Sequence, residues 1–229
     1  MDKQEFSRIE AYMRSCMADS AHDQEHIYRV LNNAMVIAKA ETQVDYDILI
    51  TACLLHDIAR QDQLADPAVC HAELGAQKAL QYLLSLGYDK AFAEAVSGCI
   101  LTHRFRKNRP PESLAAMILF DADKLDVVGA VGIARTLAYQ GTIGAPLYSR
   151  ADDGCISDGR EDTQPSFFRE YHFKLTKLYD RFYTKEGAAL ARQRQEAAAV
   201  FYESIYKEIH SFDQAGKQRL AELLEEDRV

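Results

Sequence analysis

The apolar run from Ile48 to Leu55 ends in the pair His56-Asp57, and this junction constrains the fold more than any other part of the chain. Such a run belongs in a protein interior, where an unpaired charge is costly. A bound cation is one of the few arrangements that offset this cost, because it supplies the opposite charge. The sequence therefore predicts a metal site at the end of a buried helix.

Two other segments carry side chains of the same kind. His26 precedes Val30 by one helical turn, so it shares a face with residues that should point into the core. Far downstream, Asp121, Asp123 and Asp126 cluster at the end of another apolar stretch. Two imidazoles with two carboxylates suit Mn²⁺, Fe²⁺ or Mg²⁺ and leave positions for water and substrate. The pattern predicts one catalytic metal site assembled from three segments.

Hydrophobic periodicity predicts an all-α fold, because apolar residues recur mostly at helical spacing and no alternating segment with a hairpin turn is present. Residues 141–165 are rich in Gly, Asp and Ser, which predicts a long surface loop of the kind that often serves as a lid. We expect a single domain over residues 1–229, with a metal-site core at about 20–140 and C-terminal helices over 166–226. A first helical stripe runs through Phe6, Ile9, Met13 and Met17 and ends before Asp19. The further expected helices cover about 24–40, 45–56, 68–86, 89–103, 111–127, 166–183, 187–210 and 214–226.

Composition restricts the partners and the compartment. The formal net charge of −8, without a basic tract, argues against binding to a nucleic-acid polymer. Five cysteines without a Cys-x-x-Cys pair indicate a reducing compartment. The first residues are polar and acidic, and no uncharged stretch approaches the ~18 residues that span a bilayer. We expect a cytoplasmic protein that binds neither membrane nor nucleic-acid polymer, with its oligomeric state open.

The order His26, His56-Asp57, Asp123 reproduces the pattern H…HD…D, and the chain therefore resembles the HD superfamily of metal-dependent phosphohydrolases. Segments 71–76, 103–106 and 123–135 make the small stand-alone bacterial HD hydrolases the nearest group. The resemblance implies an HD-domain helical bundle with additional C-terminal helices and a divalent metal, Mn²⁺ in preference to Mg²⁺, Fe²⁺, Co²⁺ or Ni²⁺. The implied metal ligands are His26, His56, Asp57 and Asp123.

Further residues are candidates for the chemistry around the metal. His71 and His103 lie near ends of predicted helices. The resemblance implies that they bind a second metal ion or, without one, hold phosphate or donate a proton. Arg60 follows the His-Asp pair by one turn, where related phosphodiesterases carry a lysine, and a cation there suits phosphate. The predicted catalytic residues are Asp57, Arg60, His71, His103 and Lys124, and the predicted substrate-binding residues are Arg60, His71, His103, Arg106, Lys124 and Arg135.

The resemblance implies hydrolysis of a small phosphorylated compound, most plausibly a nucleotide, with pyrophosphate release from a nucleoside triphosphate favoured. Hydrolysis of a nucleoside monophosphate or another phosphoester is the alternative within enzymes, and a ligand-sensing module with little turnover is the alternative outside them. Residues 58–61 lack the acidic pair of alarmone hydrolases, and residues 104–107 lack the Gly-Tyr-Pro signature of cyclic-dinucleotide phosphodiesterases. Both specialised activities therefore lose support.

Overall fold

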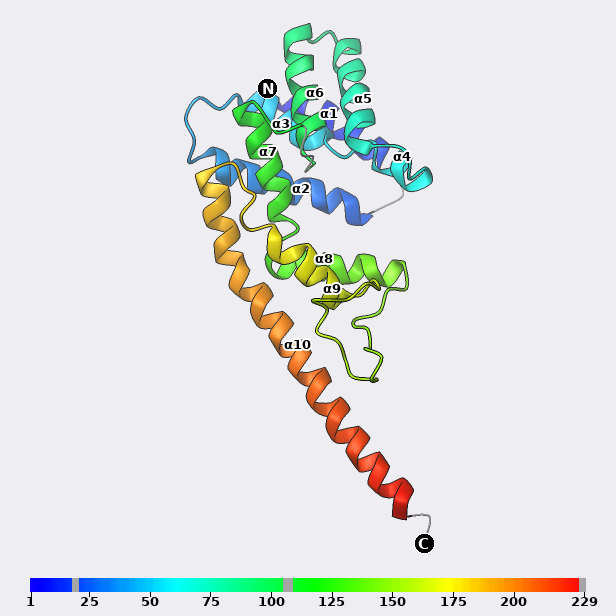
Figure 1. Ribbon diagram of the computed structural model, residues 1–229. Coiled ribbons are helices and arrows are strands. Elements are labelled where there is room, and N and C mark those ends of the chain that lie inside the picture. Colours follow the sequence, from blue (N-terminus) through cyan, green and yellow to red (C-terminus); the bar gives the residue numbers. More distant parts are fainter. Residues whose placement is uncertain (18–20, 105–108, 227–229) are drawn as a thin grey trace. The chain divides into compact units, whose positions relative to one another are not determined.

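The structure, a computed structural model, describes residues 1–17, 21–104 and 109–226, with side chains outside 21–23 and 226 (Figure 1). Helices make up nearly all the regular structure of these residues, and the β-structure recorded among them is an isolated bridge between Arg150 and Ile156. The all-α prediction is confirmed. Within these ranges, no helix is both long and apolar enough to cross a membrane.

The chain forms two compact units. The first comprises residues 1–126 together with 182–190, and the second comprises residues 127–181 together with the chain from Ala191 onwards. The first unit therefore contains residues 20–126 of the predicted metal-site core, and residues 127–140 belong to the second unit. The expectation that the whole chain is one domain stays a prediction.

The first unit is built around one buried helix, α3 (Tyr46–Leu55), which packs against α1, α2, α6 and α7. Asp45 caps this helix, since its side chain accepts a hydrogen bond of 3.0 Å from the backbone N of Ile48. Helices α5 and α6 lie side by side (Figure 1), and Gly87 ends the turn after α5 with a positive φ of 85°. The other helices of this unit are α1 (Lys3–Cys16), α2 (Ala21–Ala38), α4 (Arg60–Ala65), α5 (His71–Ser85), α6 (Lys90–Thr102) and α7 (Leu114–Leu125).

The second unit has its own aromatic core between α8 (Gly129–Thr142), α9 (Phe167–Phe173) and the long helix α10 (Lys185–Glu226), whose first turns belong to the first unit. The predicted loop is observed as irregular chain between α8 and α9. Its conformation is held by Asp162, which accepts hydrogen bonds from the hydroxyls of Ser149 (2.5 Å) and Ser157. A lid function for this loop stays a prediction.

The C-terminal helices differ from the prediction. The helix expected over 166–183 is shorter: α9 ends at Phe173, and a single 3₁₀ turn over Leu175–Lys177 follows it. The two helices expected over 187–210 and 214–226 are one continuous helix, α10. At the expected break, Asp213 pairs with Lys217 one turn later at 2.8 Å and with Arg150 at 2.7 Å. An ion pair at this spacing supports an uninterrupted helix. The short helix α4 was not predicted, because its six residues carry no apolar periodicity.

Within the first unit, Asp121 of α7 holds the beginning of α10. Its side chain is fully buried and accepts hydrogen bonds from the backbone N of Tyr183 (2.9 Å) and Thr184 (2.7 Å) and from the Thr184 hydroxyl (2.6 Å). Burial raises the pKa of Asp121, and these donors oppose the rise. The carboxylate therefore satisfies backbone groups that a helix leaves unpaired at its N-terminus.

The absence of a side chain at Gly187 lets the Asp121 carboxylate lie close to the beginning of α10. A Cβ at Gly187 would lie 2.6 Å from Asp121 Oδ2 and 2.7 Å from Thr184 Oγ1. We expect Gly187→Ala to lower the free energy of unfolding by about 1–3 kcal/mol in urea denaturation, because a buried and hydrogen-bonded group must move. In the same unit, Gly98→Ala is the matched control, since its Cβ would meet nothing within 4 Å, and its stability should be unchanged or higher by up to about 1 kcal/mol. Equal stabilities of the two variants would contradict this account of the cap.

Candidate metal centre

The first unit brings four buried histidines together near the ends of its helices. His56 and His103 are the C-cap residues of α3 and α6, His71 is the first residue of α5, and His26 lies in α2. None of the four is more than 4% exposed. Histidines this deeply buried need partners for both ring nitrogens.

Two of the rings are oriented by backbone carbonyls of their own helices. Nδ1 of His56 lies 2.8 Å from the carbonyl oxygen of Cys53, and Nδ1 of His103 lies 2.6 Å from that of Ile100. A carbonyl oxygen can only accept a hydrogen bond, so Nδ1 carries the proton in both rings. In each ring Nε2 therefore presents a lone pair.

The other two rings are oriented by side chains. Nδ1 of His26 lies 2.7 Å from Asp126 Oδ2, and Nδ1 of His71 is hydrogen-bonded to the side-chain oxygen of Gln63. Asp126 is itself 1% exposed and is held by Arg29, whose Nε and Nη2 lie 2.6 and 3.0 Å from its two oxygens. Across all four rings, Nδ1 is bonded outwards and Nε2 faces inwards.

The inward nitrogens form two clusters that share one carboxylate. The Nε2 atoms of His26 and His56 are 3.4 Å apart, and those of His71 and His103 are 3.3 Å apart. Asp57 lies between them: Oδ2 is 3.7 Å from His26 Nε2, and Oδ1 is 3.2 Å from His71 Nε2. The first cluster is completed by Asp123, whose Oδ1 is 3.4 Å from His26 Nε2.

The protonation states fit a divalent metal ion. Burial lowers the pKa of His56 to about 4 and that of His71 to about 3, so both rings are neutral. Burial works against ionisation of Asp57 and Asp123, but neighbouring histidines hold the pKa of Asp57 well below its usual range, and Lys124 with neighbouring histidines does the same for Asp123. Neutral imidazoles and ionised carboxylates are the forms that bind metals. Lone pairs that face one another across 3.3 Å need a cation between them.

His26 is protonated in the absence of metal. Burial lowers its pKa, but hydrogen bonds to Asp123 and Asp126 outweigh that effect and raise the pKa to about 9. The extra proton lies where the carboxylates would otherwise repel one another. A metal ion at the same place would take over its role.

Comparison with known proteins identifies the family. The HD domain model matches residues 24–128, the span that contains the six residues of the two clusters. YpgQ of Bacillus subtilis is 30% identical over 212 residues, which covers 90% of this chain and 94% of YpgQ. This chain is a member of the HD superfamily.

Solved structures of HD superfamily hydrolases share the fold. A predicted HD superfamily hydrolase from an uncultured Thermotogales bacterium is 30% identical, with a TM-score of 0.60 over 91% of this chain and 99% of that one. An HD-superfamily hydrolase from Bacillus thuringiensis is 27% identical, with a TM-score of 0.68 over 90% and 97%. YpgQ has been solved in complex with ADP, with 29% identity and a TM-score of 0.68 over 89% and 97%. The protein is thus an HD superfamily hydrolase, and HD domains bind a divalent metal.

The structure brings most of the predicted site residues together in the first unit. Lys124 pairs with Asp123, at 2.5 Å. Arg135 lies on α8 in the second unit and Arg106 lies outside the described residues, so their roles stay predictions. The predicted residues in or beside the two clusters are His26, His56, Asp57, Arg60, His71, His103, Asp123 and Lys124.

The supporting roles of three residues were not predicted from the sequence. Arg29 follows His26 by three residues and so lies on the same helical face, which is a signal that could have been used. Asp126 was noticed, but its pairing with His26 spans 100 positions of sequence. Gln63 lies in the short helix α4 and has no signal in the sequence.

The Asp126 carboxylate, which orients His26, should control the affinity of the site for metal. We expect Asp126→Asn to weaken Mn²⁺ binding about 10- to 100-fold, because the amide holds both His26 and Arg29 less well. Isothermal titration of metal-stripped protein measures this. Asp62→Asn, which removes a surface ion pair with Lys78, is the matched control and should bind as the wild type does. Unchanged affinity in Asp126→Asn would show that His26 is oriented without it.

Proposed function

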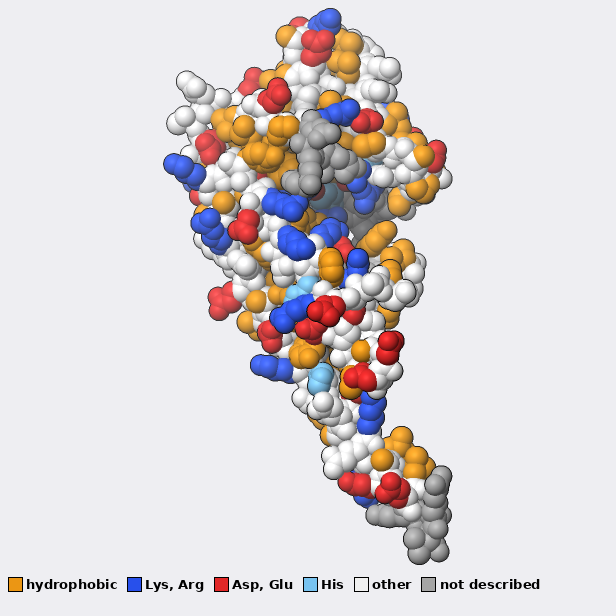
Figure 2. Space-filling model, in the orientation of Figure 1, with side chains coloured by type: hydrophobic (Ala, Val, Ile, Leu, Met, Phe, Trp, Pro, Cys, Tyr) orange, Lys and Arg blue, Asp and Glu red, His pale blue; other side chains and the backbone are white. Residues whose placement is uncertain are grey.

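We propose that this protein is a metal-dependent phosphohydrolase for a small phosphorylated compound, specifically a nucleotide, and that it releases pyrophosphate from a nucleoside triphosphate. The observation that carries the proposal is the combination of the two clusters with neighbouring cations from Arg60, Arg104 and Lys124. Figure 2 shows several Lys and Arg side chains, in blue, on the face that is drawn, interspersed with red Asp and Glu side chains. Positive groups beside a metal centre favour an anionic substrate, although the whole chain is acidic.

The residues that would hold metal divide into two sets around Asp57. His26, His56, Asp57 and Asp123 would hold one ion, and Asp57, His71 and His103 would hold a second, with one oxygen of Asp57 directed to each set. Mn²⁺ is our preferred ion, because mixed imidazole and carboxylate ligands suit it. A divalent ion held there acts as a Lewis acid that makes water a better nucleophile and neutralises charge on a phosphoryl oxygen.

The protein's own groups hold the centre in shape and bind the substrate. Lys124 neutralises the outer oxygen of Asp123 and also lies 3.4 Å from the carbonyl oxygen of His103, so it joins the two clusters. Its ammonium sits over the ring of Phe120 at 5.0 Å, which limits its movement. Arg60 would bind phosphoryl oxygens through paired N–H groups.

A nucleotide is supported by one relative. YpgQ has been crystallised with ADP, and its similarity to this chain extends over nearly the whole length of both. The local cations suit a chain of phosphates. We therefore rank nucleoside triphosphates first among the compounds to test.

Metal content tests the two-set arrangement. We expect wild-type protein loaded with Mn²⁺ and desalted to contain two ions per chain by inductively coupled plasma mass spectrometry, and His103→Ala to keep one. His103 belongs to only one of the two sets. Circular dichroism of the variant would verify its helix content. One ion in the wild type, or two in the variant, would contradict a second set built on His103.

Hydrolysis tests the activity itself. We expect chelator-stripped protein to be inactive and to release pyrophosphate from ribo- or deoxyribonucleoside triphosphates when Mn²⁺ is restored. Asp57→Asn should reduce the rate to background, because both sets lose the same carboxylate. Asp89→Asn is the control, since asparagine caps α6 as well as aspartate does. Absence of release from every nucleotide, in protein with its full metal content, would overturn the proposal.

A further inference from the structure

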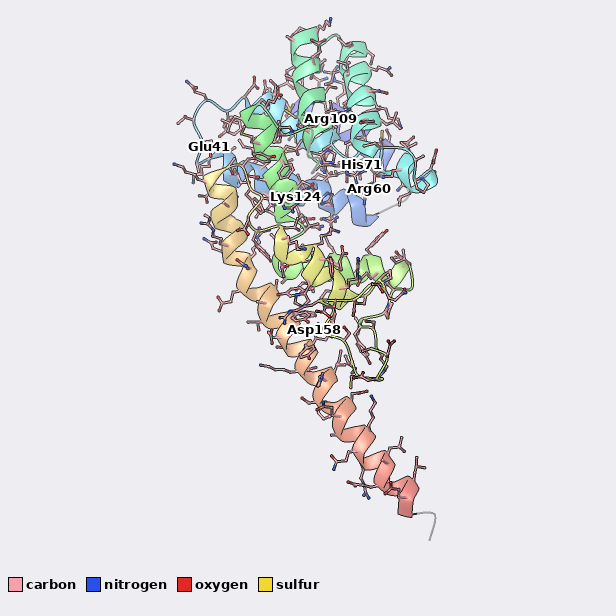
Figure 3. The ribbon with its side chains drawn as sticks, viewed as in Figure 1. Glu41, Arg60, His71, Arg109, Lys124 and Asp158 are labelled. Carbon is pink, nitrogen blue, oxygen red and sulfur yellow. The ribbon has the colours of Figure 1, made fainter. Side chains whose placement is uncertain are left out.

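Two arginines of the first unit meet at the outer edge of His71. Arg60 begins α4 and Arg104 follows α6, yet Nη1 of each lies within 3.5 Å of His71 Nδ1, at 3.4 and 3.5 Å. Figure 3 shows Arg60 and His71 close together where α4 and α5 meet. Both arginines are half-buried.

His71 is not an acceptor for either guanidinium. Its Nδ1 donates to the side-chain oxygen of Gln63, so that nitrogen has no lone pair to offer. Within the described residues, neither Arg60 nor Arg104 has a carboxylate partner, and the other recorded contact of Arg104 is with Cys70 Sγ at 4.0 Å. Both guanidinium groups therefore keep N–H donors for an external ligand.

Nearby arginines show the contrast. Arg109 forms an ion pair of 2.6 Å with Glu73, and Arg29 is held by Asp126. Two half-buried like charges at one point are unfavourable without an anion. Phosphate suits this position, because its oxygens match the paired N–H groups of a guanidinium.

The position of the two arginines defines which phosphate they reach. Nε2 of His71 faces the metal centre, 3.2 Å from Asp57 Oδ1, whereas Nδ1 faces the guanidinium groups. The two guanidinium groups and the metal centre thus lie on opposite sides of the His71 imidazole ring. A phosphorus atom under attack must lie at the metal centre, so the arginines reach the next phosphate of a chain.

We propose that Arg60 and Arg104 form a subsite for the phosphate adjacent to the one attacked, so that the preferred substrate carries at least two linked phosphates. This inference rests on the proposed function and narrows it, because a monophosphate would leave the subsite empty. The proposal gives Arg104 the role of binding the phosphate adjacent to the one attacked. Its charge and its paired donors both contribute to the subsite.

The test compares methylenediphosphonate, a pyrophosphate analogue that cannot be cleaved, with inorganic phosphate. Binding of each is measured by isothermal titration with Mn²⁺-loaded protein, in matched Mn²⁺ buffer. We expect the wild type to bind the diphosphonate about 10- to 100-fold more tightly than phosphate, and Arg104→Ala to lose most of that preference while binding phosphate unchanged. Arg104→Lys should retain part of it, and Arg109→Ala, whose arginine is paired with Glu73, should retain all of it. A full preference in Arg104→Ala, or an equal loss for both ligands, would overturn the subsite.

The subsite and the hydrolase can fail separately. Diphosphonate binding that depends on Arg104, in a protein that hydrolyses no nucleotide, would support the subsite and reject the proposed function. Nucleotide hydrolysis with the same KM for a triphosphate in wild type and Arg104→Ala would support the function and reject the subsite.

Discussion

The outward hydrogen bonds of four histidines are the constraint on which the candidate site depends. Each Nδ1 is bonded to an oxygen outside the site, from two backbone carbonyls, one carboxylate and one amide. Each ring must therefore turn Nε2 inwards, where lone pairs and the Asp57 carboxylate converge. The fold holds this arrangement in a buried place, and a cation relieves the repulsion that it creates.

The helix ends explain how such a site can exist in an apolar interior. His56 and His103 are C-cap residues, and each uses a carbonyl near the end of its own helix as its outer partner. The last carbonyls of a helix have no partner within the helix, so the imidazole satisfies one of them and is oriented in return. The same hydrogen bond thus caps the C-terminal end of the helix and orients a metal-binding side chain.

Two aspartates of α7 show how position on a helix separates roles. Asp121 and Asp123 are two residues apart, which directs their side chains about 200° apart around the helix axis. Asp123 faces His26, whereas Asp121 accepts hydrogen bonds from the first residues of α10. Asp123 therefore contributes to the candidate metal site, and Asp121 contributes to the stability of the same unit.

The sequence by itself determined the helical class, the order of the site segments and the family, because helical periodicity and the spacing H…HD…D are local properties of the chain. It also indicated His71 and His103 as helix-end residues. Tertiary structure alone decided that these two share Asp57 with the first cluster, that Asp126 orients His26, and that Arg60 and Arg104 meet at one ring. These contacts join residues up to 100 positions apart, and they depend on how α2 to α7 pack rather than on any local pattern. The helix α10 also runs through Asp213, where a break was expected, and Asp213 pairs there with Lys217 and with the distant Arg150.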